Sequence, residues 1–564
     1  MRQFFRSIFS LIYSWLSRPD LILKRANLLE LELSGDMVDI RPRFSFLQKY
    51  MARMPGSFTD MIFALKEAES DPNIKACLLK IGSSSLGWGR ASELRESIQR
   101  FRSFGKKAVG FLEETGNLEY YIATACDEII MAPSQSLNLI GLMSEVLYFK
   151  GILDKLSIKP ELLHAGKYKS AVEPYTRDSM SPEHREAVDA ILDDIFRELS
   201  ESIAQNRNLA PEKIKELIDS APHLPEEAVT QGLVDKVLYS DQVDERIERL
   251  LGEPIRRINS EQYYRLRRAR LRSLAAFRKA PMLALIYASG VIEQSDDREY
   301  QELGESITPE RMLDALRAVR ENPHIKAAVL RVDSPGGSAV ASDLIWREVN
   351  LLRKAKPLIV SMGDVAASGG YYIAMPGEKI LAQPCTLTGS IGVIAGKLNL
   401  RGLYNKFGLK KEQLKRGEHA DLYSDYTDLA GSKGEKMAKE IGHFYEKFVQ
   451  KAADARKMNW EEMDSRAQGR VWTGKQALAL GLIDGFGGLR SAIDLAKQSI
   501  GLRPEDRVVF EIHPRPKMRF LPMFPFRIPN IPFLDGRESR LVSRLARLAR
   551  DKILLLMPFI IRIK

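Results

Sequence analysis

The clearest pattern of hydrophobic and polar positions lies between residues 357 and 375, which read PLIVSMGDVAASGGYYIAM. The apolar residues at 358–360 and 362 predict a buried strand that stops at Gly363, and residues 364–367 predict a turn. Residues 371–375 predict a short helix. Ser368 stands just before this helix, where unpaired backbone N–H groups favour developing negative charge, so it is a candidate nucleophile. A serine at this place more often caps a helix, and both interpretations stay open at this point.

The same patterning shows that the chain contains an internal repeat. The tetrapeptide YYIA at residues 120–123 returns at 371–374, and DPNIKA at 71–76 returns in the related stretch ENPHIKA at 321–327, in both cases 251 residues later. GLVD at 232–235 returns as GLID at 481–484, at a distance of 249 residues. Three anchors at a nearly constant distance indicate a duplicated domain. Each copy alternates apolar strands with helices, which predicts an α/β fold with a parallel sheet and right-handed crossovers.

The length of 564 residues is compatible with two to four domains. The predicted boundaries are residues 28–250 for an N-terminal repeat domain and 281–501 for a C-terminal repeat domain. The arginine-rich residues 251–280 between them are predicted to form a basic connecting helix. Residues 1–27 and 502–564 lie outside the repeats.

Comparing the two copies at the distance of 251 residues shows that each lacks part of a possible active site. Asn117 stands opposite Ser368, and residues 82–86, GSSSL, stand opposite the glycine-containing DSPGG at 333–337. The first copy in turn carries Lys169, whose counterpart in the second copy is Ala420. This complementarity predicts one active site split between the two repeats.

The chemistry of such a split site is coherent. Gly336 and Gly337 follow the strand predicted at 325–332 and allow a turn with exposed backbone N–H groups, as an oxyanion hole requires, although an ordinary turn after Pro335 explains them too. Lys169 can act as a base if burial lowers its pKa from about 10.4 to roughly 7–8. The commoner role of a lysine is a solvated surface charge.

The charge and the two chain ends point to an anionic partner. The net charge is +11 and the isoelectric point is near 9.2, which favours nucleic acid or an anionic membrane surface. Residues 1–27 begin with an amphipathic segment that Pro19 ends, and it suits either a membrane interface or the protein's own core. Residues 502–564 combine a proline-rich part with a basic amphipathic helix and an apolar run at 553–561. We favour a lipid surface over nucleic acid or a partner subunit, because the apolar run has no use on nucleic acid.

The remaining reactive residues predict little chemistry of their own. The three cysteines stand among apolar neighbours and are expected in the core, and the seven histidines show no spacing typical of metal ligands. We therefore expect no metal and no cofactor.

Four motifs together resemble the long, two-domain form of the signal peptide peptidase A family. These are YKSAVEP at 168–174, DSPGG at 333–337, AASGGYY at 366–372 and LTGSIG at 387–392. The resemblance covers roughly residues 28–500 and implies tandem Clp protease/crotonase-like domains, built as a ββα superhelical spiral. The long bacterial form of this family normally opens with a transmembrane helix, whereas this chain opens with the short amphipathic segment.

The resemblance also implies roles for individual residues. It implies that Ser368 is the nucleophile, that Lys169 is the general base, and that Ser390 hydrogen-bonds the lysine. The implied oxyanion hole comes from the loop of Gly336 and Gly337 together with the backbone N–H of Gly369. Substrate pockets are expected near the strand ends at Val332 and Val365 and around residues 391–394.

For the whole protein, the resemblance implies a membrane-associated serine endopeptidase that degrades released signal peptides and other apolar peptides. A homotetramer at a bacterial inner membrane is implied as well, and nucleic acid is not an expected partner. Two other functions stay open from the residues alone, a crotonase-type acyl-CoA enzyme and a catalytically silent oligomeric scaffold. Labelling by a serine-reactive phosphonate separates the peptidase from both.

Overall fold

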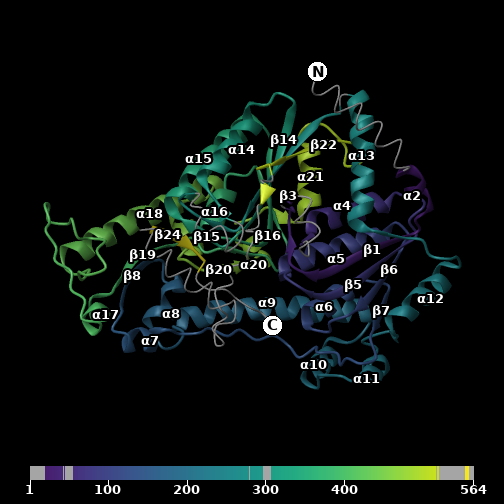
Figure 1. Cartoon of the computed structure of the whole chain (residues 1–564), viewed down its shortest axis with the longest axis horizontal. Coiled ribbons are helices and arrows are strands. Elements are labelled where there is room, and N and C mark those ends of the chain that lie inside the picture. The colour runs from purple at the N-terminus through teal and green to yellow at the C-terminus, as the bar shows by residue number, and fades with distance from the viewer. Residues whose placement is uncertain are drawn as a thin grey trace.

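A computed structural model describes residues 19–41, 43–44, 55–278, 280–295, 306–515, 518–519 and 553–557 (Figure 1). The amphipathic segment predicted at the N-terminus lies outside these residues up to position 18, and helix α2 (Pro19–Arg25) begins at the proline that was expected to end it. The basic helix predicted around residues 540–550 also lies outside the described residues.

The first repeat is built on a six-stranded sheet in which every pair of neighbouring strands is parallel. Its strands, in spatial order, are β10 (Arg257–Asn259), β1 (Leu28–Gly35), β5 (Ala76–Ser84), β6 (Lys107–Leu112), β7 (Glu128–Met131) and β9 (Lys236–Val237). Its principal helices are α4 (Phe58–Glu69), α5 (Trp88–Ser103), α6 (Asn117–Ala123) and α9 (Pro182–Arg207). Strands such as β5 are buried on both faces, as apolar runs in a parallel sheet are expected to be.

The second repeat has the same architecture with one antiparallel edge. Its main sheet has the order β20 (Val471–Thr473), β18 (Leu387–Gly389), β16 (Leu358–Ala367), β14 (Ile325–Ser334), β11 (Met282–Ser289) and β22 (Val509–His513), and β17 (Lys379–Ala382) also pairs with β16. Only the β18–β20 pair along this path is antiparallel in the described part of the chain. Its helices include α14 (Pro309–Glu321), α15 (Ala339–Ala355), α16 (Gly369–Ala374), α18 (Ser432–Arg456) and α21 (Leu489–Gln498). The α/β fold predicted from the sequence is confirmed.

The two repeats share a hydrophobic core, because one face of the second repeat's main sheet packs against the first repeat and the other face packs against helices of the second repeat. Along β11, Leu283, Leu285 and Tyr287 belong to the same buried cluster as Phe58 and Leu94 of the first repeat. The alternate residues of the strand, Ala284, Ile286 and Ala288, pack into the second repeat's own core. This alternation is what a strand with period two allows, and it stacks the repeats as layers.

Equivalent side chains make equivalent bonds in the two copies. Tyr120 donates its hydroxyl hydrogen to the Leu233 carbonyl (2.6 Å), and Tyr371 donates to the Leu482 carbonyl (3.0 Å). Arg207 pairs with Asp235, and Arg456 pairs with Asp484, in each case through the two terminal guanidinium nitrogens. Asn117, the counterpart of Ser368, instead exchanges two hydrogen bonds with Gly141, at 2.8 and 3.2 Å.

A third sheet joins the two repeats. Its order is β13 (Ser306–Ile307), β12 (Val291–Ile292), β15 (Gly336–Ser338), β24 (Ile553–Leu556), β19 (Val393–Asn399) and β8 (Lys159–Ala165). Strand β8 of the first repeat pairs antiparallel with β19 of the second along its entire length, from Lys159 opposite Asn399 to Ala165 opposite Val393. This ladder carries the segment that follows β8 into the second repeat.

Three predictions about local structure are wrong. Strand β16 does not stop at Gly363 but runs to Ala367, because Val365, Ala366 and Ala367 pair with β18 after a shift in register against β14. The predicted connecting helix at 251–280 contains strand β10 before α13 (Ser260–Arg278), since Arg257, Ile258 and Asn259 extend the first sheet beside β1. The apolar residues 553–556, expected at a lipid surface, form strand β24 inside the third sheet.

The described helices give no direct support for a membrane span. None of them combines the length and the apolar character that crossing a bilayer requires.

Candidate active site

Ser368 lies on a strained turn between β16 and α16. Its backbone has φ 56° and ψ −114°, a positive φ that is uncommon for a residue with a side chain. The turn is held by the Ser368 N–H, which donates to the Gly389 carbonyl (2.8 Å). The Ser368 side chain makes no capping bond to the helix, although it stands at the N-cap position. The simple capping interpretation is therefore excluded, and the hydroxyl faces Lys169 instead.

Lys169 reaches Ser368 from the other repeat. Its Nζ lies 2.8 Å from the Ser368 Oγ and 2.9 Å from both the carbonyl oxygen and the Oγ of Ser390. All three side chains are fully buried, and burial lowers the pKa of Lys169 well below its usual range. A neutral amine has two N–H hydrogens and one lone pair. The two oxygens of Ser390 can accept both hydrogens, which leaves the lone pair for the Ser368 hydroxyl proton.

Glycines make room for the lysine where it enters the second repeat. A β-carbon at Gly469 would lie within 2.8 Å of the N, Cα and Cβ atoms of Lys169, and one at Gly392 would lie 3.0 Å from its Cδ. Gly166, with φ +101°, similarly passes against the backbone of Gln468. The Tyr168 N–H donates to the Gln468 carbonyl (2.8 Å), which fixes the loop just before the lysine. These contacts depend on glycine, since a side chain would push the two repeats apart.

The glycine loop of the second repeat lies against the start of α16. Gly336 and Gly337 have positive φ values of 98° and 154°, so both adopt conformations that favour glycine. A β-carbon at Gly369 would lie 3.1 Å from the Gly336 Cα and 3.2 Å from the Gly337 N, which shows how closely the loop and the helix start approach. The backbone N–H groups of Gly337 and Gly369 are thus near one another beside Ser368, as an oxyanion hole requires.

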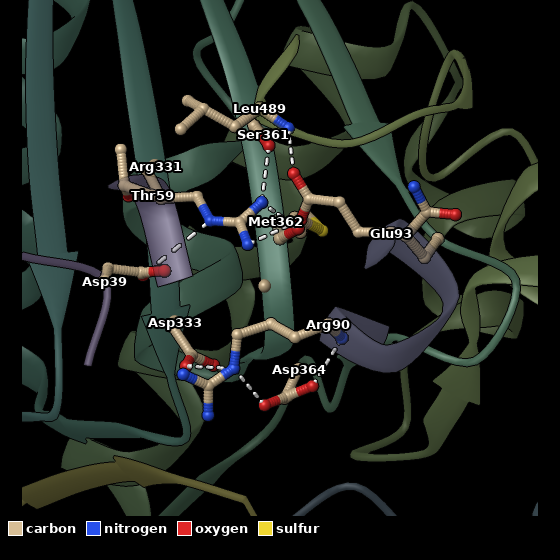
Figure 2. Close-up of polar contacts among 12 residues, drawn as sticks. Asp39, Thr59, Arg90, Glu93, Arg331, Asp333, Ser361, Met362, Asp364 and Leu489 are labelled. Atoms are coloured by element: carbon tan, nitrogen blue, oxygen red, sulfur yellow. Dashed lines mark hydrogen bonds and ion pairs between the residues drawn. The ribbon is translucent and has the colours of Figure 1, made fainter. Parts of the chain in front are cut away.

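Arg90 of the first repeat contacts Asp364 on β16, the strand that leads to Ser368. The carboxylate of Asp364 accepts hydrogen bonds from the N–H groups of Gly87 (3.0 Å) and Arg90 (2.7 Å) at the start of α5, and it pairs with the Arg90 guanidinium (Figure 2). A carboxylate at the start of a helix is also favoured by the helix dipole. Asp364 therefore ties β16, four residues before Ser368, to the first repeat.

Asp333 lies on the opposite side of the same guanidinium, 3.9 Å from the Arg90 Nε (Figure 2). Its carboxylate accepts a hydrogen bond from the Val365 N–H (3.0 Å), and so it connects the end of β14 with β16. Burial raises the pKa of Asp333 to about 6, and the neighbouring Asp364 adds to this shift, while the Arg90 charge opposes it. Asp333 directly precedes the loop that contains Gly336 and Gly337.

A second buried ion pair lies deeper in the interface between the repeats. Arg331 of β14 donates to the Glu93 carboxylate of α5 (2.7 Å) and to the Ser361 hydroxyl (2.8 Å), and Asp39 lies 3.7 Å from its Nε (Figure 2). Glu93 also accepts from the Leu489 N–H (2.5 Å), so one carboxylate joins α5, β14 and α21. Burial raises the pKa of Glu93, while Arg331 acts in the opposite direction.

The structure brings together all of the site residues predicted from the sequence, namely Lys169, Gly336, Gly337, Ser368, Gly369 and Ser390. Of the residues expected to line the substrate pockets, only some lie near the site. Val332 and Ile391 lie in the core of the second repeat, whereas Ile394 contacts the apolar cluster around β24. Sequence reasoning missed Arg90, Gly392 and Gly469. In the sequence, Gly392 is marked only as the last residue of LTGSIG, and Gly469 only by its place in the short stretch AQG at 467–469. Nothing in the sequence marks Arg90, because its partner Asp364 is 274 residues away.

Comparison with known proteins identifies the family. Two segments, residues 100–252 and 350–503, match peptidase family S49, one in each repeat. The chain is 37% identical over 452 residues to the chloroplastic serine protease SPPA of Arabidopsis thaliana, which covers 80% of this chain and 67% of that one. It is 30% identical over 506 residues to Protease 4 of Haemophilus influenzae (85% and 80%) and 32% identical over 459 residues to Protease 4 of Salmonella typhi (79% and 72%).

Among solved structures, a ClpP1 point mutant from Listeria monocytogenes aligns with a TM-score of 0.25 and 18% identity, over 39% of this chain and 99% of that one. The family matches are much more extensive, and they confirm the resemblance to the signal peptide peptidase A family. The chain therefore belongs to peptidase family S49 and is a serine-type peptidase.

Proposed function

We propose that the chain is an endopeptidase in which Ser368 is the nucleophile and Lys169 is the general base, so that the two repeats contribute to one active site. The observation that carries this proposal is the 2.8 Å distance between the Lys169 Nζ and the Ser368 Oγ, in a place where burial favours the neutral amine. A crotonase-type acyl-CoA enzyme would need neither residue.

In the proposed reaction, the Ser368 oxygen attacks the carbonyl carbon of the scissile peptide bond while its proton passes to Lys169. The negative charge that forms on the carbonyl oxygen is held by the N–H groups of Gly337 and Gly369. The C–N bond then breaks, and the leaving amine takes the proton from Lys169. Water attacks the resulting ester with Lys169 again accepting a proton, and the acid product leaves as Ser368 regains its hydrogen.

Ser390 has a positioning role in this proposal. Its hydroxyl and carbonyl oxygens accept the two hydrogens of the neutral amine, at 2.9 Å each, and so direct the lone pair toward Ser368. Ser390 itself has a positive φ of 51°, and its N–H donates to the Arg470 carbonyl (2.7 Å), which holds it at the end of the β18–β20 pair.

The proposed substrates are apolar peptides, including signal peptides released after export, as the family resemblance suggests. Association with an anionic membrane surface is part of the proposal, since the chain carries a net charge of +11 and basic or amphipathic segments at both ends. Assembly as a homotetramer at a bacterial inner membrane rests on the resemblance alone.

The test is hydrolysis of an apolar peptide ester and amide by wild type, Ser368→Ala and Lys169→Ala between pH 6 and 10. Both variants are expected to lose at least about 100-fold in kcat/KM, and the wild-type profile is expected to rise with an apparent pKa well below that of free lysine. Lys167→Ala is the matched control, because this neighbouring lysine is exposed. Full activity of Lys169→Ala would place the base elsewhere, and full activity of Ser368→Ala would rule out the proposed nucleophile.

A serine-reactive phosphonate supplies a second readout that does not depend on the choice of peptide. It is expected to label wild type and not Ser368→Ala. A catalytically silent scaffold would leave both proteins unlabelled.

A further inference from the structure

A segment far along the chain lies directly on the glycine loop of the candidate active site. Strand β24 pairs antiparallel with β15, with Leu556, Leu555 and Leu554 opposite Gly336, Gly337 and Ser338. On its other edge β24 pairs antiparallel with β19, with Leu554 opposite Ile394. It therefore fills the space between β15 and β19, where Figure 1 shows the three strands side by side. In the described part of the chain, β15 and β19 do not pair directly with each other, and β24 is the strand that connects them.

The register of β24 directs one of its carbonyl groups at the proposed oxyanion hole. The Met557 N–H donates to the Pro335 carbonyl (2.8 Å), so residues 335 and 557 form a hydrogen-bonded pair. Such pairs recur at every second residue of an antiparallel ladder, which makes Gly337 and Leu555 the next one. The Gly337 N–H consequently faces the Leu555 carbonyl. A side chain at Gly336 would collide with this same carbonyl oxygen and with the Gly369 N.

The side chains of β24 alternate between two apolar environments. Leu554 and Leu556 are 2% and 8% exposed and belong to a buried cluster with Leu153, Val172 and Tyr175 of the first repeat. Leu555, which points to the other face, is 1% exposed and packs into the core of the second repeat. Val172 is three residues from Lys169, so the cluster that takes Leu554 and Leu556 adjoins the lysine loop.

We propose that residues 553–557 act as a built-in peptide ligand that occupies the substrate groove between β15 and β19. An extended peptide that adds a strand between two sheet edges gains main-chain hydrogen bonds, and pockets for alternate side chains give it specificity. The occupant seen here is strongly apolar, ILLLM, and its leucines at 554 and 556 lie in the apolar cluster that they form with residues of both repeats. A peptide substrate must therefore displace this segment, and substrates with leucine-like side chains at alternate positions fit the same cluster.

This inference rests on the proposed function only in calling the groove a substrate groove, so its test uses peptide binding, which requires no catalysis. The full-length protein carries Ser368→Ala in all samples, and the probe is a fluorescein-labelled synthetic peptide with the sequence of residues 552–558, KILLLMP. The Leu554→Glu/Leu556→Glu variant is compared with the parent, and Leu414→Glu, at a position 92% exposed, is the matched control.

The double variant is expected to bind the peptide at least about tenfold more tightly than the parent or the control, because the groove is then no longer occupied from within the chain. A factor of ten corresponds to about 1.4 kcal/mol, less than the usual effect of removing two buried leucine contacts. The Leu554→Ala/Leu556→Ala variant introduces no buried charge, and it is expected to shift the affinity in the same direction if the glutamate variant does not fold. Equal affinity in all folded proteins, or binding by none, would overturn the inference.

A parallel assay keeps the two proposals apart. With Ser368 restored, the leucine variants are expected to react at least about tenfold faster than wild type with a serine-reactive phosphonate, for the same reason. If the peptide binds as expected but no protein is labelled or hydrolyses peptides, the built-in ligand is supported and the proposed function fails. If all proteins hydrolyse peptides and peptide affinity does not change, the inference fails and the proposed function stands.

Discussion

Asp333 and Asp364 face the same guanidinium of Arg90, yet replacing each by asparagine is expected to change stability in opposite directions (Figure 2). Asp333→Asn keeps an oxygen that accepts the Val365 N–H and loses only a 3.9 Å charge contact with Arg90. Asp364→Asn loses the closer ion pair and one of the acceptors for the N–H groups of Gly87 and Arg90.

The magnitude for Asp333 follows from its pKa, which burial raises from 3.8 to about 6. The ionised carboxylate is therefore disfavoured in the folded protein, and two pKa units correspond to about 3 kcal/mol. The side chain is 18% exposed, so solvent screening reduces this to about 2 kcal/mol. This free-energy cost of keeping Asp333 ionised in the folded protein is fully present above pH 6, where the carboxylate is ionised in the folded state. It fades as the pH falls toward 3.8, where the unfolded chain becomes protonated as well.

The assay is thermal unfolding of wild type and both variants between pH 4 and 8. At pH 8, Asp333→Asn is expected to raise the melting temperature by about 2 °C, because the unfolding entropy of a chain of this length is large, and the difference should shrink to nothing near pH 4. Asp364→Asn is expected to lower stability by about 3 kcal/mol at pH 8, because it breaks a buried pair. A destabilised Asp333→Asn protein at pH 8, or a stabilisation that does not depend on pH, would refute the reasoning that burial outweighs the attraction of Arg90.

Three further predictions concern the lysine and its surroundings. Gly469→Ala is expected to reduce kcat/KM at least about 100-fold, because its new methyl group meets Lys169, whereas Gly408→Ala, with a similar φ of 70° and open space around it, should keep full activity. Ser390→Ala is expected to lower kcat/KM by roughly tenfold and to shift the pH profile, since one of two acceptors for the lysine hydrogens is lost; an unchanged profile would contradict the positioning role. Lys169→Met is expected to raise the melting temperature at pH 7, and the gain should shrink as the pH rises toward 10.5. The reason is that the folded state disfavours the charged lysine, and this penalty disappears once the unfolded chain is also neutral; a gain that stays constant with pH would argue against it.

The sequence was sufficient to predict the duplication and the partners at the site. Repeated tetrapeptides fix the distance between the copies, and that distance shows directly which copy has Ser368 and which has Lys169. The glycine pair at 336–337 is informative for a physical reason, since both residues have positive φ values that other residues rarely adopt. These features depend on local chemistry, so the sequence can show them.

Features that depend on distant partners could not be predicted in this way. Strand β16 continues past Gly363 because β18 pairs with residues 365–367 and Ser334 of β14 pairs with Ala366 in a shifted register. Local propensity instead predicts a turn at Asp364. The run ILLL at 553–556 has the composition of a lipid-facing segment and equally that of a buried strand, and periodicity over four residues cannot separate the two. The Arg90–Asp364 contact joins residues far apart in sequence, with no motif to mark either one.

The pair of hydrogen bonds between Asn117 and Gly141 has a consequence for how inhibitors should titrate this protein. In the first repeat the amide side chain of Asn117 holds the turn that corresponds to the one carrying Ser368, and Ala420, the counterpart of Lys169, is an exposed residue of a loop. A serine placed at position 117 would therefore find neither a base nor an open turn. Covalent inhibitors should saturate at one equivalent per chain, and any assembly of chains should carry as many reactive centres as it has copies, not twice that number.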